Sequence, residues 1–137
     1  MKIAISGSMV FSEKMLEVKK KLERLGHEVE ISRFAASYAG QPQGEKERRT
    51  LIDKMHNDAM REFWEKIKTS DALLVLNYDR KGVKNYIGGN TFLEIGFAHV
   101  LNKKIFLLNP IPDIDYYTSE IEATKPIILT GDLSNIA

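Results

Sequence analysis

The start of the chain alternates between hydrophobic patterns typical of a strand, a helix and a second strand. Residues 2–6 form a short run of largely apolar, β-branched character that ends at Gly7, as expected of a strand. The apolar residues that follow recur at spacings of four and three, which predicts an amphipathic helix: Phe11, Met15, Val18, Leu22 and Leu25. Gly26 suits the C-cap of that helix, and residues 27–34 alternate as a second strand.

A polar segment with several turn-forming residues comes next, over residues 35–46. Segments of this length without regular structure are usually functional or disordered, so we interpret this one as a candidate lid. A long polar helix is then predicted, because apolar residues recur at every fourth position: Leu51, Met55, Ala59, Phe63 and Ile67. This helix is predicted to end near Thr69 and Ser70.

The second half of the chain continues the alternation of strands and helices. Residues 72–76 are apolar at every position, which is typical of a parallel strand covered on both faces and indicates the central strand. A helix over residues 91–101 follows a glycine pair, and residues 104–108 form another apolar strand. A short helix over residues 116–123 and a brief strand over residues 127–129 complete the pattern.

Five strands separated by helices predict an α/β fold with a doubly wound, mostly parallel sheet. The preference for right-handed crossovers favours a flavodoxin-like, Rossmann-like three-layer arrangement. The length of 137 residues predicts one domain over residues 1–137. Ligands of such sheets bind beyond the carboxyl ends of the strands. The segments to examine are therefore residues 6–10, the stretch after residue 34, and residues 77–90 and 109–115.

Composition narrows the classes of function. The apolar runs are too short to span a bilayer, and 20 basic against 19 acidic residues leave no excess for binding a nucleic acid backbone. The chain has no cysteine, which excludes disulfides and thiolate chemistry. The three histidines are scattered without metal-ligand spacing. We therefore expect no metal and no cofactor. A cytoplasmic location is expected, because Met1 leads directly into a strand pattern rather than a signal segment.

The first turn of the predicted sheet, Ser6-Gly7-Ser8, is a candidate ligand contact. Backbone N–H groups and the helix dipole attract anions at such a position. The turn matches neither the phosphate-binding pattern of nucleoside triphosphatases nor that of dinucleotide-binding proteins. A simpler role is equally compatible with the sequence, since Ser8 or Ser12 would also serve as a helix cap.

Glu94 is the strongest candidate for chemistry. It follows Gly88, Gly89, Asn90 and Thr91 and is predicted to lie in the first turn of a helix. The helix dipole would keep its carboxylate ionised near neutral pH, which suits a nucleophile or an electrostatic stabiliser better than a general acid. The spacing Thr91-x-x-Glu94 also matches a capping box, in which the glutamate would only satisfy backbone groups.

A proton donor would have to come from another residue. Asp58 on the predicted long helix is one candidate, although a solvent-exposed carboxylate is the ordinary interpretation of that position. Asn77, Tyr78 and Asp79 follow the central strand at its carboxyl end, where a substrate would lie. Tyrosines are frequent in the predicted loops, where they would stack on a base or a sugar, or pack against neighbouring residues.

Two stretches resemble the nucleoside 2-deoxyribosyltransferase superfamily, which includes the 2′-deoxynucleoside 5′-monophosphate N-hydrolases. They are residues 90–98, Asn-Thr-Phe-Leu-Glu-Ile-Gly-Phe-Ala, and residues 102–108, Asn-Lys-Lys-Ile-Phe-Leu-Leu. The resemblance implies that Glu94 is the nucleophile that attacks C1′ of the sugar. The pair Asn57-Asp58 is similar to an Asn-Asp pair whose aspartate contacts the base, and Gly7-Ser8 and Tyr78-Asp79 also fit the layout.

The chain departs from that superfamily at three positions. Ala4 stands where a tyrosine that orients the nucleophile is common, so the resemblance requires a substitute such as Tyr38 or Tyr78. Gly88 replaces the carboxylate of the transferases or the serine of the monophosphate hydrolases, and Val10 replaces the arginine of the hydrolases. A phosphate would therefore depend on backbone N–H groups, Lys81 or Lys84.

The resemblance predicts an enzyme that cleaves the N-glycosidic bond of a nucleoside or nucleoside 5′-monophosphate. Glu94 and Asp58 would be catalytic, and the expected substrate-binding residues are Ser6, Gly7, Ser8, Asn77, Tyr78, Asp79, Gly88, Gly89, Asn90 and Thr91. Hydrolysis and transfer both remain open. A non-catalytic nucleotide-binding domain is the alternative, while a phosphoacceptor domain lacks the acidic cluster it would need. A homo-oligomer is also expected, with the segment from Tyr116 onward near a neighbour's site.

Overall fold

The computed structural model describes residues 1–136, and five parallel strands in this range form one sheet. The strands are β1 (Lys2–Ser6), β2 (Glu28–Glu30), β3 (Ala72–Val75), β4 (Lys104–Leu107) and β5 (Ile127–Ile128). Their order is β2-β1-β3-β4-β5, and each neighbouring pair is parallel. The predicted doubly wound α/β fold with a flavodoxin-like order is thus confirmed, with β3 as the central strand.

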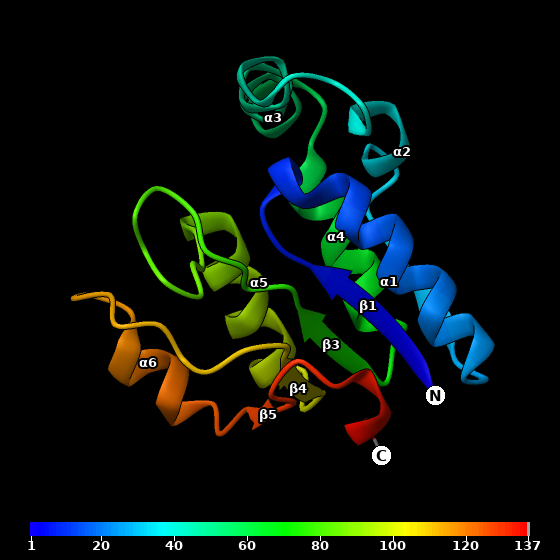
Figure 1. Cartoon of the computed structure of the whole chain (residues 1–137), viewed down its shortest axis with the longest axis vertical. Coiled ribbons are helices and arrows are strands. Elements are labelled where there is room, and N and C mark those ends of the chain that lie inside the picture. Colours follow the sequence, from blue (N-terminus) through cyan, green and yellow to red (C-terminus); the bar gives the residue numbers. More distant parts are fainter. Residues whose placement is uncertain (137) are drawn as a thin grey trace.

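Helices cover both faces of the sheet (Figure 1). The helical elements are η1 (Met9–Phe11), α1 (Ser12–Arg24), α2 (Ala35–Tyr38), α3 (Gln43–His56), α4 (Ala59–Lys68), α5 (Gly89–Val100), α6 (Thr118–Ala123) and η2 (Leu133–Asn135). On one face, Leu74 of β3 belongs to the same buried cluster as Met15 of α1. On the other face, Leu73 clusters with Phe63 of α4 and Ile95 of α5.

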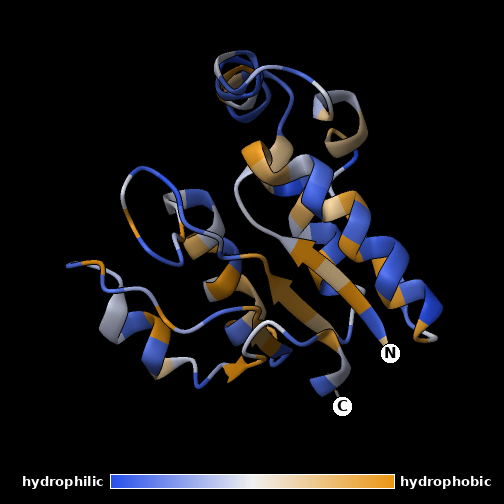
Figure 2. Ribbon diagram, in the orientation of Figure 1, coloured by the Kyte–Doolittle hydropathy of each residue, from blue (hydrophilic) through white to orange (hydrophobic). Residues whose placement is uncertain are grey.

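This two-sided burial explains why β3 has no polar position. Successive side chains of a strand point to opposite faces, so Leu73 and Leu74 enter different clusters although they are neighbours in sequence. Figure 2 shows the consequence, since β1 and β3 are mainly orange whereas most of α3 is blue. The sheet is therefore a fixed platform, and polar residues are left to the segments beyond its strand ends.

The predicted long helix is in fact two helices, α3 and α4, separated at Asn57 and Asp58. Asp58 has a φ of 50°, in the left-handed region, which ends the regular hydrogen bonding between the two. The predicted apolar stripe is wrong on the α3 side, where Leu51 is 59% and Met55 is 70% exposed. Only the α4 part of the stripe packs against the sheet, through Phe63 and Ile67.

The candidate lid, residues 35–46, is more ordered than predicted because it contains α2 and the start of α3. The second strand is shorter than expected and comprises Glu28–Glu30. Figure 1 shows α2 and α3 beyond the carboxyl end of β1. These two elements therefore form one wall above the edge of the sheet where ligands of this fold bind.

Polar contacts rather than apolar packing fix α3 to the rest of the molecule. Its one buried side chain is Lys46, which forms an ion pair with Glu13 of α1 and donates a hydrogen bond to the Val10 carbonyl at 3.2 Å. The Lys46 ammonium group and the Gly40 N–H lower the pKa of Glu13 to about 2. The position of α3 above the sheet thus depends on the charge of Glu13.

The segment after Tyr116 packs against this chain's own core, and its position near a neighbour's site stays a prediction. Ile121 and Ile136 are buried in the two clusters, and the ring of Tyr117 stacks on Phe92 with a centroid distance of 4.4 Å. Tyr116 is 88% exposed. The last residue of the predicted segment, residue 137, lies outside the described residues. In residues 1–136, no helix combines the length and apolar character that crossing a membrane requires.

Candidate active site

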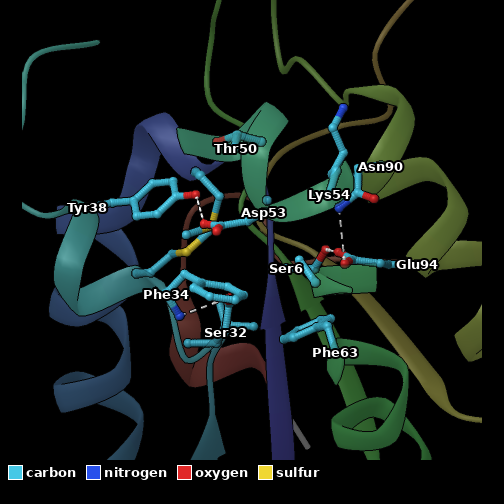
Figure 3. Close-up of a pocket in the computed structure, with 15 residues that line it drawn as sticks. Ser6, Ser32, Phe34, Tyr38, Thr50, Asp53, Lys54, Phe63, Asn90 and Glu94 are labelled. Atoms are coloured by element: carbon cyan, nitrogen blue, oxygen red, sulfur yellow. Dashed lines mark hydrogen bonds between the residues drawn. The ribbon is translucent and has the colours of Figure 1, made fainter. Parts of the chain in front are cut away.

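Glu94 lies on α5 and is buried, with 5% of its surface exposed. The helix begins at Gly89, two residues earlier than predicted, so Glu94 is in its second turn. The predicted capping box is therefore wrong: Gly88 occupies the N-cap position in an extended conformation. The Glu94 carboxylate is free of any capping duty and points into a pocket at the carboxyl end of β1 (Figure 3).

Two side chains hold the Glu94 carboxylate in place. The Ser6 hydroxyl, at the end of β1, donates a hydrogen bond to Oε1, and the Asn90 amide donates to Oε2 at 3.4 Å. Asn90 is one helical turn before Glu94, so the two side chains share a face of α5. The hydroxyl that contacts Glu94 is thus that of Ser6, whereas the Tyr38 hydroxyl donates to Asp53.

Burial dominates the electrostatics of this carboxylate. It raises the pKa of Glu94 from about 4.5 to about 7, although the hydrogen bond from Ser6 acts in the opposite direction. The expectation that the helix dipole keeps Glu94 fully ionised is corrected, because removal from water outweighs the dipole in the second turn. Glu94 is thus poised to change its charge near neutral pH, as active-site carboxyl groups often are.

The pocket around Glu94, here called the inner pocket, is narrow, with a volume of about 50 Å³. Its lining residues include Ser6, Gly7, Ser32, Phe34, Tyr38, Thr50, Asp53, Lys54, Phe63, Asn90 and Glu94. Figure 3 shows Ser6, Asn90 and Glu94 on one side and Tyr38 with Asp53 on the opposite side. The inner pocket is therefore lined by the buried Glu94 carboxylate on one side and by Tyr38 and Asp53 on the other, with aromatic rings also among its lining residues.

The side opposite Glu94 is built by a tyrosine–carboxylate pair. The Tyr38 hydroxyl donates a hydrogen bond to Asp53 Oδ2, and the Asn57 amide donates to Oδ1 at 2.7 Å. Burial, together with the Asp53 carboxylate, holds the pKa of Tyr38 well above its ordinary value. Tyr38 thus stays protonated and fixes one oxygen of Asp53, which in turn ties α2 to α3.

A wider cavity of about 330 Å³, here called the outer cavity, adjoins the inner pocket. The two share the residues Gly7, Met9, Thr50, Lys54 and Asn90. The outer cavity is further lined by Ser8, Val10, Glu47, Leu51, Arg80, Lys81, Tyr86, Gly88, Gly89 and Thr91. Most of the substrate-binding residues predicted from the sequence are therefore brought together around one continuous depression.

Asp58 is not brought to Glu94. Its side chain is 60% exposed, and its carboxylate pairs with Arg61 at 3.0 Å. It lines a separate surface depression with Trp64 and Phe97, although its neighbour Ala59 reaches the inner pocket. The left-handed conformation of Asp58 at the break between α3 and α4 turns its side chain away. Asp53, which sequence reasoning missed, is the aspartate that faces Glu94 across the pocket.

Three further predicted residues also lie outside both cavities. Asn77 is fully buried and joins the ends of β3 and β4, because its amide donates to the Asn109 carbonyl at 2.8 Å and accepts from the Asn109 N–H at 2.9 Å. Tyr78 packs edge-on against Phe11. Asp79 accepts the Asn85 N–H at 2.8 Å. These side chains shape the segment after β3, and their positions correct the expectation that they contact a ligand directly.

Several lining residues on α3 were not predicted to face a ligand, because Leu51 was assigned to a buried apolar stripe and the others are polar. Glu47, Thr50, Leu51 and Lys54 have the spacing of one helix face on α3. A helix face of this kind is recognised as the wall of a pocket only when the elements opposite it are known. The sequence pattern alone therefore did not identify this face as part of a pocket. Arg80 was missed because it lies in a polar loop of unremarkable composition. Among residues 1–136, no group of three or more potential ligands is arranged to hold a metal ion.

Comparison with known proteins reveals a shared fold. No family model matches the sequence, and no curated protein matches it either. The structure is similar to that of the Clostridium botulinum CMP N-glycosidase BcmB, with a TM-score of 0.51 and 16% identity over 93% of this chain and 85% of that chain. The chain shares the fold of this glycosidase. A 2-deoxyribosyltransferase from Bacillus psychrosaccharolyticus also matches, with 27% identity, a TM-score of 0.42, and coverage of 78% and 71%.

Proposed function

We propose that this protein cleaves the N-glycosidic bond of a nucleoside or nucleotide, with Glu94 as the nucleophile. The observation that carries this proposal is the Glu94 carboxylate itself, which is buried at the floor of a pocket and held there by Ser6 and Asn90. A buried carboxylate with no cationic partner among the described residues costs stability. A catalytic role accounts for the presence of the buried Glu94 carboxylate in spite of this cost.

The proposed reaction follows the logic of a retaining glycosidase. An oxygen of ionised Glu94 bonds to C1′ of the sugar while the bond from C1′ to the base nitrogen breaks, and that electron pair leaves with the base. The base takes up a proton from solvent water, and the sugar remains attached to Glu94 as an ester. Water then releases the free sugar, or a second base forms a new nucleoside and restores the carboxylate.

The inner pocket suits a departing base on the side opposite Glu94. Phe34 and Phe63 supply apolar rings for a planar base. Asp53, fixed by Tyr38 and Asn57, presents a carboxylate on the same side. We assign to Asp53 the hydrogen bond to the base, in place of the exposed Asp58 expected from the sequence resemblance.

The fold shared with the CMP N-glycosidase supports this choice of reaction class. The alternative is a protein that binds a nucleotide without turnover. The structure favours the enzyme over that alternative at one point, because Ser6 supplies a hydroxyl to Glu94 even though Ala4 replaces the tyrosine expected from the resemblance.

The proposal is tested by incubating the protein with ribo- and deoxyribonucleosides and their 5′-monophosphates and measuring free base by chromatography. Base release that is lost in Glu94→Gln, with an unchanged circular dichroism spectrum, would support the proposal. Adding a second base shows whether it is incorporated into a new nucleoside, which separates transfer from hydrolysis. Binding of a nucleotide by calorimetry without any base release would establish the non-catalytic alternative.

A further inference from the structure

The outer cavity has a strong positive character. Lys54, Arg80 and Lys81 line it, and Glu47 is the one carboxylate among its lining residues. The inner pocket differs, because Asp53 and Glu94 are both there. An extended ligand that spans both cavities would therefore meet carboxylates at one end and cations at the other. A nucleotide has this division, since its glycosidic carbon and its 5′ group lie at opposite ends of the sugar.

Arg80 is the least exposed of these cations. Its side chain is 12% exposed. Nη1 donates to the Ser8 hydroxyl at 2.9 Å, and the guanidinium lies 5.4 Å from the centre of the Tyr86 ring. The loop that carries it is closed by two backbone hydrogen bonds between Arg80 and Val83, at 2.9 and 3.0 Å. Arg80 is thus held against the turn after β1 before any ligand arrives.

The hydrogen bonds of this guanidinium are incomplete. Nη2 donates to Glu47 Oε1 at 3.1 Å, whereas Nε is buried and has no partner among the described residues. Nε and Nη2 lie on the same edge of the guanidinium plane, and that edge matches two oxygens of a carboxylate or phosphate. The Glu47 side chain, which is 44% exposed, accepts a hydrogen bond from Nη2 through one oxygen and leaves Nε without an acceptor. A phosphate would occupy both positions.

The surroundings of Arg80 complete an anion site. The turn at Gly7 and Ser8 and the N-terminus of α5 at Gly88 and Gly89 line the same cavity. Backbone N–H groups at the start of a helix favour anions. This arrangement of a buried guanidinium, exposed lysines and a glycine-flanked helix start is a built feature of the cavity, not a helix terminus alone.

We propose that Arg80 is the residue that selects a nucleoside 5′-monophosphate over the corresponding nucleoside. This inference rests on the proposed function for its choice of substrate. The 5′-phosphate displaces Glu47 from Nη2 and takes both Nε and Nη2, while Lys54 and Lys81 add charge. Glu47 accepts the hydrogen bond from Nη2 when no phosphate is bound, and its negative charge opposes phosphate binding.

The direct test is binding of ribose 5-phosphate, which carries the phosphate but has no bond to cleave. Calorimetry and the thermal midpoint are measured for the wild type and for Arg80→Met, Arg80→Lys and Glu47→Gln. We expect Arg80→Met to weaken binding roughly 10- to 100-fold, since hydrogen bonds to charged groups are lost. Arg80→Lys is expected to be intermediate because lysine keeps the charge but not the two-point geometry. Glu47→Gln is expected to bind more tightly.

Arg24→Met serves as the matched control, because Arg24 is an exposed arginine in the last turn of α1. It should bind ribose 5-phosphate like the wild type. The same variants are assayed for base release from a nucleoside and its 5′-monophosphate. We expect Arg80→Met to raise KM for the monophosphate and to lower the preference for the monophosphate, measured as the ratio of kcat/KM for the monophosphate to kcat/KM for the nucleoside.

The outcomes separate this inference from the proposed function. Equal cleavage of nucleoside and monophosphate, with neither affected in Arg80→Met, would overturn the role of Arg80 while leaving the proposed function intact. Ribose 5-phosphate binding that depends on Arg80, without release of any base, would establish the phosphate site and contradict the proposed function. A folded Arg80→Lys variant that binds like Arg24→Met would also overturn the inference.

Discussion

The hydroxyl of Ser6 donates a hydrogen bond to the carboxylate of Glu94, joining residues 88 positions apart in the sequence. The bond brings the end of β1 to the second turn of α5. Hydrogen bonds to the charged form of an acid lower its pKa, whereas burial raises it. Ser6 is therefore a positioning residue that also sets the pH at which Glu94 becomes ionised.

We predict that Ser6→Ala shifts the acidic limb of the pH profile of kcat/KM to higher pH. Loss of the hydrogen bond leaves burial unopposed, so the pKa of Glu94 rises further above about 7. Activity at neutral pH should fall roughly 10-fold or more. Ser6→Thr, which keeps the hydroxyl, should retain the wild-type limb. A Ser6→Ala profile that is lower at every pH but not displaced would assign Ser6 a purely structural role.

Glu94→Gln is expected to remove base release while stabilising the fold at alkaline pH. The folded-state pKa of Glu94, about 7, is above its ordinary value of 4.5, so the folded state binds the proton more tightly than the unfolded state. Glu94 therefore lowers the stability of the wild type as the pH rises from about 4.5 to about 7. The cost above pH 7 is on the order of 3 kcal/mol.

Thermal unfolding of both proteins at pH 5 and pH 8 checks this second expectation. The midpoint of Glu94→Gln should exceed that of the wild type at pH 8, and the difference should shrink at pH 5. A variant that is less stable than the wild type at both pH values, but active, would show that Glu94 serves the helix rather than the reaction.

The sheet was predictable because burial on two faces leaves a clear sequence pattern. The apolar run at residues 72–76 marks the central strand, and the turn at Gly7 marks the end of β1. Once the strand order is known, Ser6 and Glu94 must lie at the same edge. Glu94 was therefore predicted from position and motif together.

The position of α3 above the sheet could not be predicted in the same way. Its position depends on polar contacts between residues distant in sequence, such as Lys46 with Glu13 and Tyr38 with Asp53. Such pairs leave no periodic signal, because each partner alone resembles an ordinary surface residue. The break at Asp58 is equally local, and it decides which aspartate faces Glu94.

Asp53 and Asp58 give a matched pair of variants. We predict that Asp53→Asn slows release of a poor leaving base more than release of an activated one, because a hydrogen bond matters most where the departing charge is least stable. Asp58→Asn, which loses an exposed ion pair with Arg61, should change activity little. The ratio of rates for the two bases is measured in each variant. The reverse result, with the ratio altered only in Asp58→Asn, would return the role to Asp58.

Because Lys46 of α3 pairs with Glu13 of α1, we predict that the attachment of α3 to the rest of the molecule weakens at acidic pH. The pKa of Glu13 is lowered to about 2 in the folded state, so its contribution is present above pH 4.5 and is lost as the pH falls from about 4.5 towards 2. The protection of the α3 amides, taken as the ratio of the intrinsic to the observed exchange rate at each pH, should therefore fall over this range. Glu13→Gln should show fast exchange in α3 already at pH 7, while Glu17→Gln, on an exposed part of α1, should not. Equal exchange in Glu13→Gln and the wild type would contradict this account.

Finally, we predict a homo-oligomer that uses the outer face of α5 rather than the C-terminal segment. The apolar residues of that segment are largely occupied within the chain, whereas Leu93 is 44% and Val100 is 83% exposed, seven residues apart on one side of α5. Exposed apolar residues grouped on one face mark interaction sites more often than single ones do.

Light scattering at micromolar concentration should give a multiple of 15.6 kDa. Val100→Asp should shift the mass to that of the monomer. Leu25→Asp, at a 53% exposed position after α1, should leave the oligomer intact. A wild-type mass of 15.6 kDa would refute the oligomer, and an unchanged oligomer in Val100→Asp would place its interface elsewhere.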